Sequence, residues 1–128
     1  MDEKFLYHIW DEGHLVPNLK TVSGKDLKVN YQGQFNTFRG PDFVNAIISI
    51  EGEDLQGAVE IHKNTQDWIK HSHQEDVFYN QVILHIVLNN DSPSPFTMKE
   101  NGELVEKKKK KNQLSAEIQK LLADIGDK

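Results

Sequence analysis

Three polar residues at short spacings could together hold a metal ion and a water molecule. Asp42 lies in the tetrapeptide GPDF, and Glu60 and His62 lie in the hexapeptide GAVEIH. Side chains two residues apart on a strand point to the same face, so Glu60 and His62 share a face if this segment is a strand. Carboxylates gathered beside a nitrogen base suit a divalent ion and its bound water. The pattern therefore predicts a metal site at these three residues.

A plainer interpretation of the two carboxylates remains open. Aspartate is a common turn residue after Gly-Pro, so Asp42 could cap a turn while Glu60 is solvated. A hairpin turn over residues 52–54 predicts that Asp42 lies opposite Lys63 and Glu60 opposite Asn45. The two carboxylates then lie near the same end of the hairpin without facing each other, and can still meet at one ion.

A further histidine, His85, interrupts the apolar run VILHIVL. A buried imidazole costs about 1–3 kcal/mol for each nitrogen left without a partner. One interpretation is a core histidine bonded to a carbonyl, to Tyr79 or to Tyr31. The other is a residue that binds the metal or orients one of its carboxylate ligands.

Four more polar residues are candidates for the surroundings of this site. His71 and His73 lie two apart in HSHQED and could bind one ion from a strand, or could simply be polar loop residues. Asp76 and Asn80 precede the strand that carries His85 and could join the site around its ligands.

The hydrophobic pattern indicates the elements that must position these residues. An apolar stripe predicts a helix over 2–12, and alternating or β-branched runs predict strands. The expected elements, in order, are a helix over 2–12, strands over 27–31, 43–51 and 55–63, a helical turn over 65–71 and a buried strand over 82–88. The order is therefore α-β-β-β-α-β.

The chain changes character after residue 90. The breaker segment NNDSPSP is followed by five consecutive lysines, Lys107–Lys111, and by an amphipathic pattern that Ser115 could cap. We expect a core domain over 1–90, a flexible basic linker over 91–111 and a C-terminal helix over 112–128. The lysine run is interpreted as a solvated linker or as an extension of that helix.

Composition narrows the function classes. The formal net charge of −5 argues against a protein coated for non-specific nucleic-acid binding, although a nuclease can carry local basic groups. There is no cysteine, so thiolate metal sites and disulfides are excluded. No apolar run approaches the roughly 20 residues of a membrane span. We expect a cytoplasmic protein that does not enter a membrane.

The chain resembles an uncharacterised bacterial family known only as a domain of unknown function. The likeness covers about residues 1–90, and the lysine-rich tail does not look like that family's continuation. It rests on motifs in a specific order: GPDF (40–43), GAVEIH (57–62), the pair Asp67-Trp68, HSH (71–73) and YNQVILHIV (79–87).

A more remote resemblance is to the PD-(D/E)XK nucleases. Pro41-Asp42, followed after 18 residues by Glu60-Ile61-His62, is similar to that signature. The resemblance implies an α/β restriction-endonuclease-like core of order αβββαβ with a mixed central sheet. It also implies that Asp42 and Glu60 bind Mg²⁺ or Mn²⁺, while His62 replaces the usual lysine. The expected function is metal-dependent cleavage of phosphodiesters in nucleic acid, at a modified or inactive site. The alternative is a non-catalytic interaction or scaffold module.

Overall fold

The protein is built around one mixed β-sheet. The structure, a computed structural model, describes residues 7, 10, 19–92 and 94–109. Its eight strands are β1 (Leu19–Lys20), β2 (Asp26–Tyr31), β3 (Gln34–Phe35), β4 (Phe43–Ile50), β5 (Glu53–Asn64), β6 (Val82–Asn89), β7 (Phe96–Met98) and β8 (Leu104–Lys109). The four long strands expected over 27–31, 43–51, 55–63 and 82–88 are confirmed as β2, β4, β5 and β6.

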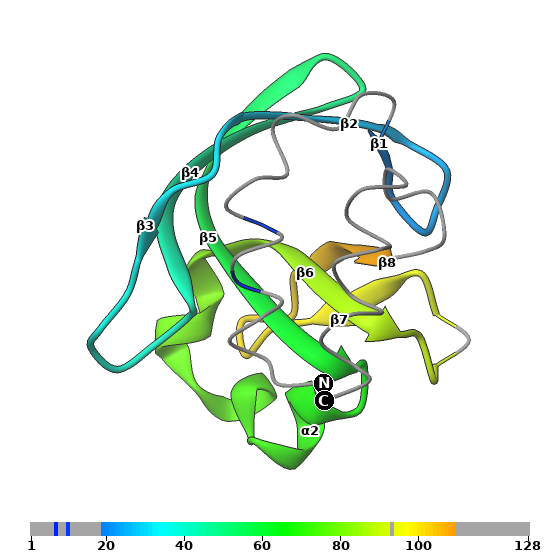
Figure 1. The fold of residues 1–128 in the computed structure, drawn as a ribbon. Helices are drawn as coiled ribbons and strands as arrows, with labels where there is room; N and C mark the ends of the chain where they lie inside the picture. Colours follow the sequence, from blue (N-terminus) through cyan, green and yellow to red (C-terminus); the bar gives the residue numbers. More distant parts are fainter. Residues whose placement is uncertain (1–6, 8–9, 11–18, 93, 110–128) are drawn as a thin grey trace, which may run out of the picture.

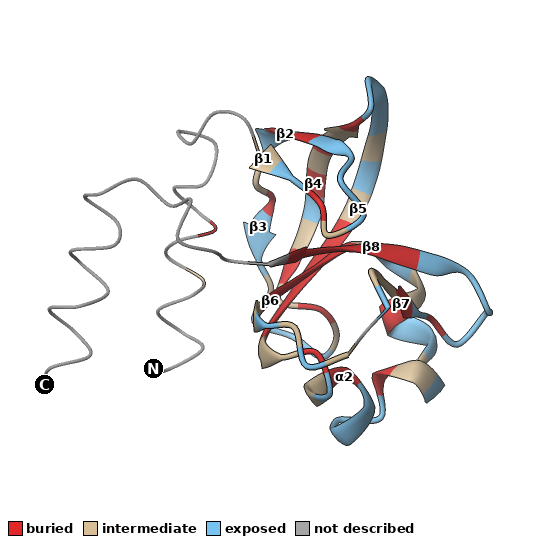
Figure 2. Cartoon of the chain, turned by 90° about the vertical axis from the view of Figure 1, so that its right-hand side faces the viewer, coloured by how far each residue is buried: buried red, intermediate tan, exposed pale blue. Residues whose placement is uncertain are grey.

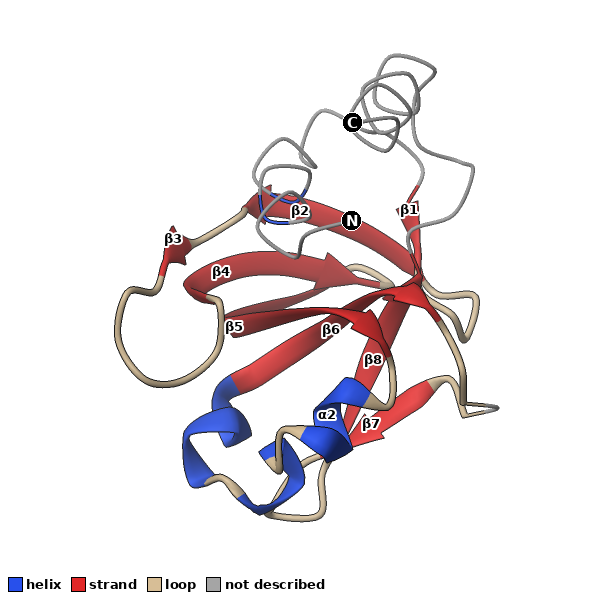
Figure 3. Cartoon of the chain, turned by 60° about the horizontal axis from the view of Figure 1, so that its bottom comes forward, coloured by secondary structure: helices blue, strands red, loops and turns tan. Residues whose placement is uncertain are grey.

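Short helical segments fill the connection from β5 to β6. They are α2 (Asp67–Lys70) and the 3₁₀ helices η2 (His73–Glu75) and η3 (Val77–Gln81). Figure 3 shows them gathered on one side of the sheet, next to β6 and β7. The helical turn expected over 65–71 is therefore confirmed. The crossover it begins allows β6 to run parallel to β5.

The sheet combines antiparallel and parallel pairing. The strand order is β1-β2-β4-β5-β6-β8-β7, with β3 beside β4. Pairs from β1 to β5 are antiparallel, whereas β5–β6 and β6–β8 are parallel. The expected mixed central sheet is confirmed.

The sheet curls strongly (Figure 1), and the turn between β1 and β2 meets β8. In the turn between β1 and β2, the Val22 backbone N–H donates to the Lys107 carbonyl at 2.7 Å. Ser23 in the same turn donates a hydrogen bond to the buried Glu106 of β8. The curl distinguishes an inner face of the sheet from an outer face. Successive residues of each strand point alternately to these two faces.

Each face carries its own apolar cluster. The inner cluster contains Val59, Ile61, Leu84 and Ile86 together with apolar residues of β2 and β4. The outer cluster lies under the α2–η3 segment and consists of Ala58, Trp68, Tyr79, Val82 and Val105. Figure 2 shows the buried positions concentrated in β5, β6 and β8. Glu60 and His62 alternate with Val59 and Ile61, so both polar side chains belong to the outer face.

A bulge in the β4–β5 hairpin changes the expected pairing. The turn is made by Glu51 and Gly52, both at positive φ, one residue earlier than predicted. The register then shifts between Phe43 and Ala46, where Asn45 has φ 60°. Phe43 consequently pairs with Val59, so the residues that follow this pair on the two arms of the hairpin are Asp42 and Glu60. The expectation that Asp42 and Glu60 do not lie opposite each other was wrong, because the earlier turn moves the register by two residues and the extra residue of the bulge by one more.

The segment expected to be a flexible basic linker over 91–111 contains two strands of the sheet. β8 pairs with β6 on one side and with β7 on the other. Lys107 and Lys108 are buried in β8, contrary to the interpretation of the lysine run as solvated. Neighbouring strands on both sides bury most of β8 whatever its composition, although Leu104 at its start stays exposed.

Both expected terminal helices lie outside the described residues, apart from Tyr7 and Trp10. These two have helical backbone, and Trp10 joins the inner apolar cluster. Within the described ranges, no helix has both the length and the apolar character needed to cross a membrane.

Candidate functional site

The outer face of β5 and β6 brings together one carboxylate and two imidazoles. Glu60 and His62 project from β5, and the parallel register places Glu60 beside His85 of β6. All three residues are buried, with 4%, 1% and 0% of their surface exposed. Ionisable groups are seldom buried so deeply unless they bind one another or a ligand.

The segment after β5 adds two more histidines from the opposite side. Ser72, at φ 60°, separates α2 from η2 and turns the chain between His71 and His73. His73 is buried and stacks on the Tyr79 ring with 3.7 Å between centroids, whereas His71 is exposed. The His62 ring lies 5.1 Å from each of these two histidine rings. These histidines were predicted as candidates, and the structure brings both to the site.

Glu60 is the centre of the polar contacts. Its Oε2 atom lies 3.2 Å from His62 Nε2 and 2.8 Å from His73 Nε2, and its Oε1 accepts a hydrogen bond from the Asp42 backbone N–H at 3.0 Å. The His73 ring is poorly aligned for a hydrogen bond, but at this distance its Nε2 atom is still paired with the carboxylate and helps to lower the pKa of Glu60.

A buried chain of hydrogen bonds lies behind Glu60. His62 Nδ1 is 2.9 Å from His85 Nε2, and His85 Nδ1 is 2.8 Å from the hydroxyl of Thr97 in β7. Because Glu60 Oε2 is an acceptor, a neutral His62 carries its proton on Nε2 and accepts at Nδ1 from His85 Nε2–H. Thr97 then donates to His85. Burial lowers the pKa of His85 well below its usual value, which keeps that ring neutral.

Asp42 is at the edge of this group and turns its carboxylate toward other partners. Oδ2 accepts from the Ile61 backbone N–H at 2.8 Å, and Oδ1 accepts from the Tyr7 hydroxyl at 3.0 Å. Both oxygens therefore already have hydrogen-bond partners within the protein, whereas a metal ligand needs an oxygen that is available to the ion. The hairpin brings Asp42 to Glu60 as predicted, but it does not turn the Asp42 side chain toward the histidines.

The two neighbouring carboxyl groups differ in acidity. Burial, followed by the charge of Glu60, raises the pKa of Asp42. Burial also opposes ionisation of Glu60, but its contacts with His62, His73 and Asp42 outweigh that effect and lower its pKa. Glu60 is therefore the ionised member of the pair, which is the form that binds a cation.

The cluster contains a group with the spacing of metal ligands. His62, His71 and His73 each offer one ring nitrogen, and these three atoms lie within 4.8 Å of one another. Imidazole nitrogen suits Zn²⁺ and related transition ions, whereas Mg²⁺ prefers oxygen ligands. This donor set therefore differs from the oxygen-dominated site expected for Mg²⁺ from the sequence.

Two predicted residues have other partners. Asp76 accepts from the Phe78 backbone N–H at the start of η3 and pairs with Arg39 at 3.4 Å. Asn80 binds Glu100 and the Asn101 backbone N–H. Among the contacts of the described residues, neither side chain bonds to Glu60 or to the histidines. Nearness in sequence to β6 is no guide to their partners, because Asp76 caps η3 and Asn80 bonds to the turn between β7 and β8.

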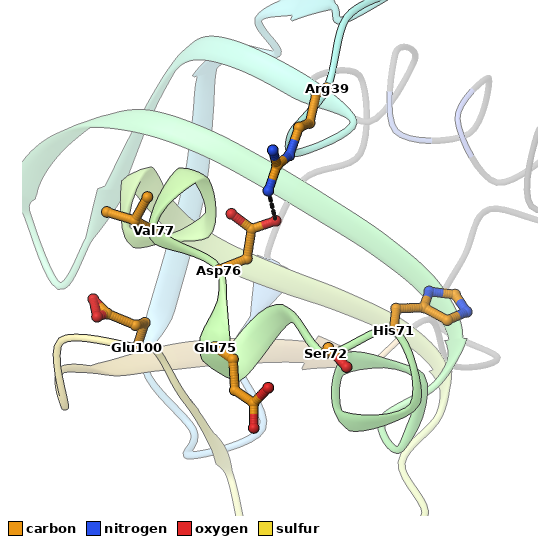
Figure 4. A pocket seen from close by; sticks show the side chains of 7 residues that line it. All are labelled: Arg39, His71, Ser72, Glu75, Asp76, Val77 and Glu100. Carbon is orange, nitrogen blue, oxygen red and sulfur yellow. Dashed lines mark hydrogen bonds and ion pairs between the residues drawn. The ribbon is translucent and has the colours of Figure 1, made fainter.

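A groove next to the cluster gives access from solvent. Its volume is about 380 Å³, and it is lined by Arg39, His71, Ser72, Glu75, Asp76, Val77 and Glu100 (Figure 4). His71 belongs to both the groove and the histidine cluster. The Arg39 guanidinium also lies over the Phe78 ring at 4.8 Å. The exposed His71 thus forms the boundary between the buried polar groups and the outside.

Sequence reasoning missed Thr97 and Tyr7. Both make their contacts from segments more than ten residues away in the chain, and neither belongs to a recognisable motif. A single threonine after SPSPF carries no local signal for a role beside His85. Only the position of β7 in the sheet identifies it.

Comparisons with known proteins place the chain in a family. No curated protein and no solved structure matches it. A family model described as Protein of unknown function (DUF2851) matches residues 3–125. The match extends past residue 90 and includes the lysine-rich segment, which had not looked like part of the family. It confirms the resemblance predicted from the GPDF, GAVEIH and HSH motifs. The chain therefore belongs to the DUF2851 family of proteins of unknown function.

Proposed function

We propose that this chain is a metal-dependent hydrolase of phosphodiesters, with nucleic acid as its substrate class. The observation that carries this proposal is the alignment of Asp42 with Glu60 across the β4–β5 bulge, with His62 two residues farther along β5. A buried carboxylate that is surrounded by imidazoles is suited to holding a metal ion and its water.

The order of the elements supports the same proposal. β2, β4 and β5 form an antiparallel meander, the α2–η3 segment follows, and β6 returns parallel to β5. This is the βββαβ part of the order implied by the resemblance to PD-(D/E)XK nucleases. Asp42 precedes the middle strand of the meander and Glu60 lies on the third, which are the positions of the two acidic residues in that signature. We therefore propose a restriction-endonuclease-like core.

The residues of the site would serve the reaction in different ways. Glu60 and its neighbouring histidines would hold the metal ion, which when bound would supply an activated water. That water would form the new bond to phosphorus while the bond to the leaving ester oxygen breaks, and the leaving oxygen would take up the proton that the water releases. Asp42 holds Glu60 in place through its backbone N–H and fixes the end of the hairpin through Ile61. His62 stands where the signature has lysine.

A specific observation favours the second candidate, a non-catalytic module. Both Asp42 oxygens already accept hydrogen bonds from Ile61 and Tyr7, as a structural carboxylate would. The groove beside the site also carries Glu75 and Glu100, which repel a phosphodiester. On this interpretation the buried polar groups only hold β4, β5 and β6 in register.

Cleavage assays on the whole chain separate the two candidates. Supercoiled DNA, single-stranded RNA and bis(p-nitrophenyl) phosphate are each incubated with the protein and Mg²⁺, Mn²⁺ or Zn²⁺. We expect metal-dependent hydrolysis that is lost in Glu60→Gln and retained in Glu53→Gln, an exposed glutamate at the start of β5. Melting curves confirm that both variants are folded. No hydrolysis of any substrate, or equal hydrolysis by Glu60→Gln, would support the non-catalytic module.

A further inference from the structure

We infer that Glu60, His62, His71 and His73 form a binding site for one transition-metal ion of the Zn²⁺ class, and that the site discriminates against Mg²⁺. This inference concerns the site of the proposed function and names its metal. It rests on that function only in assuming a resident ion, and it would stand if the protein cleaved no phosphodiester.

The first argument is that His62 has only one nitrogen available. Its Nδ1 atom is committed to His85 Nε2 at 2.9 Å, deep beneath the sheet surface. Its Nε2 atom faces Glu60 Oε2 at 3.2 Å. The ring therefore presents a single defined nitrogen to the cluster, and the contact with His85 fixes the orientation of that nitrogen, as the outer partners of metal-binding histidines do.

The second argument is the convergence of two histidines on one oxygen. The His73 side chain is 9% exposed, and its Nε2 atom lies 2.8 Å from Glu60 Oε2 in poor alignment for a hydrogen bond. Two imidazole Nε2 atoms thus converge on one carboxylate oxygen. A cation among these three atoms would use both nitrogens and the oxygen at once, and would do so from the positions that the atoms already hold.

The third argument concerns the fourth ligand and the route of entry. Ligand atoms around a tetrahedral zinc with bonds of about 2.0–2.1 Å lie ~3.4 Å apart. The three histidine nitrogens are within 4.8 Å of one another, so closure around an ion needs only a small rotation of a side chain. His71 is exposed and borders the groove, so its ring is free to make that movement. An ion can therefore enter from the groove side and be enclosed by His71.

The buried hydrogen-bond chain can adjust to the ion without moving heavy atoms. A metal on His62 Nε2 displaces its proton to Nδ1, which then donates to His85 Nε2. His85 in turn carries its proton on Nδ1 and donates to Thr97. A threonine hydroxyl both donates and accepts, so every contact in the chain is kept with its direction reversed.

The donor types decide the class of metal. Three imidazole nitrogens and one carboxylate oxygen are typical ligands of Zn²⁺ and its transition-metal neighbours, which hold four ligands as a tetrahedron and can expand to five; the water of the proposed hydrolysis would be that fifth ligand. Mg²⁺ requires about six oxygen ligands in an octahedron and binds imidazole poorly. The Mg²⁺ or Mn²⁺ expected from the sequence came from the two carboxylates, and the Asp42 carboxylate is turned toward Tyr7 and Ile61.

Binding of the metals themselves tests this inference without any activity assay. The whole chain is freed of metal with a chelator and titrated by calorimetry with Zn²⁺ and with Mg²⁺. Co²⁺ then serves as a spectroscopic probe, because its visible bands report four-coordination. We expect one Zn²⁺ per chain, bound more tightly than Mg²⁺, and a Co²⁺ spectrum of the tetrahedral type.

Variants locate the ion. His71→Asn changes an exposed residue and should leave the melting temperature of the metal-free protein unchanged while weakening Zn²⁺ binding at least ~10-fold. His73→Asn should weaken it further, and the control Glu53→Gln, at an exposed residue away from the groove, should have no effect. Equal Zn²⁺ affinity in wild type and His71→Asn, or Mg²⁺ affinity that matches Zn²⁺, would overturn the inference. Zn²⁺ binding with the expected variant pattern but no hydrolysis would reject the proposed function alone.

Discussion

Replacement of Thr97 by valine should destabilise the protein through His85. The Thr97 hydroxyl is the partner of His85 Nδ1 at 2.8 Å, and these residues are 6% and 0% exposed. Valine has the shape of threonine, so no cavity forms, and water cannot reach the ring nitrogen that loses its partner. A buried polar atom left in this way costs about 1–3 kcal/mol. A loss of that size lowers the melting temperature by roughly 2–8 °C per kcal/mol in domains of this size range.

Thr65→Val is the matched control. Thr65 is also buried, and its hydroxyl donates to Asn90 Oδ1 at 2.8 Å. That oxygen accepts a second hydrogen bond from Lys107 Nζ at 3.1 Å, so it keeps a partner in the variant. The variant loses one hydrogen bond and leaves no buried atom without a partner, so the free energy of unfolding should fall by about 0.5–1.5 kcal/mol.

Urea unfolding followed by circular dichroism measures both variants. The slopes should be unchanged, so that the midpoints report stability directly. The reasoning predicts a larger loss for Thr97→Val than for Thr65→Val. If the two losses are equal, or if Thr97→Val is neutral, then His85 does not depend on Thr97 and the hydrogen-bond chain behind Glu60 is not a structural unit.

Three other substitutions test the fold. Lys107→Met should raise stability at pH 7 by about 1 kcal/mol in urea unfolding, because a fully buried charge is replaced by an apolar chain of similar length. Burial lowers the pKa of Lys107 in the folded protein below the 10.5 of the unfolded chain. Between the folded and the unfolded pKa the unfolded chain binds more protons, so wild-type stability should rise with pH in that window, and Lys107→Met should lack this rise. Gly57→Ala should cost about 1–3 kcal/mol, since its Cβ would lie 2.6 Å from the Gln81 carbonyl oxygen, and an unchanged melting temperature would contradict the close approach of η3 to β5. Asn45→Val should cost about 1–3 kcal/mol in thermal melting although Asn45 is exposed, because a β-branched residue is strained at φ 60°; a neutral result would argue against the bulge.

Local pattern was enough to predict most of the sheet. The strands β2, β4, β5 and β6 follow from alternating or continuous apolar residues, and a strand's periodicity is a property of a few neighbouring residues. The same periodicity placed Glu60 and His62 on one face. The match to the DUF2851 family likewise follows from motifs that are legible in the chain itself.

The C-terminal part shows where local pattern is insufficient. The residues LVEKKK carry no apolar run, yet they form β8 between β6 and β7. Pairing with β6 supplies the backbone hydrogen bonds, and the curl of the sheet supplies Ser23 and Lys25 as partners for Glu106. Strand formation there depends on neighbours distant in sequence, which composition does not reveal.

The candidate site likewise depends partly on the sequence and partly on the tertiary structure. The sequence by itself determined which residues could do chemistry and that Glu60 and His62 share a face, because strand geometry relates residues two apart. Only the tertiary structure decided that Asp42 faces Glu60 and that His85 lies behind His62, because a bulge and a parallel register set those pairings. It also decided that His73 reaches Glu60 while Asp76 and Asn80 do not. Contacts between distant segments depend on how the whole sheet curls and packs, and that is a property of the complete fold rather than of any short stretch of the chain.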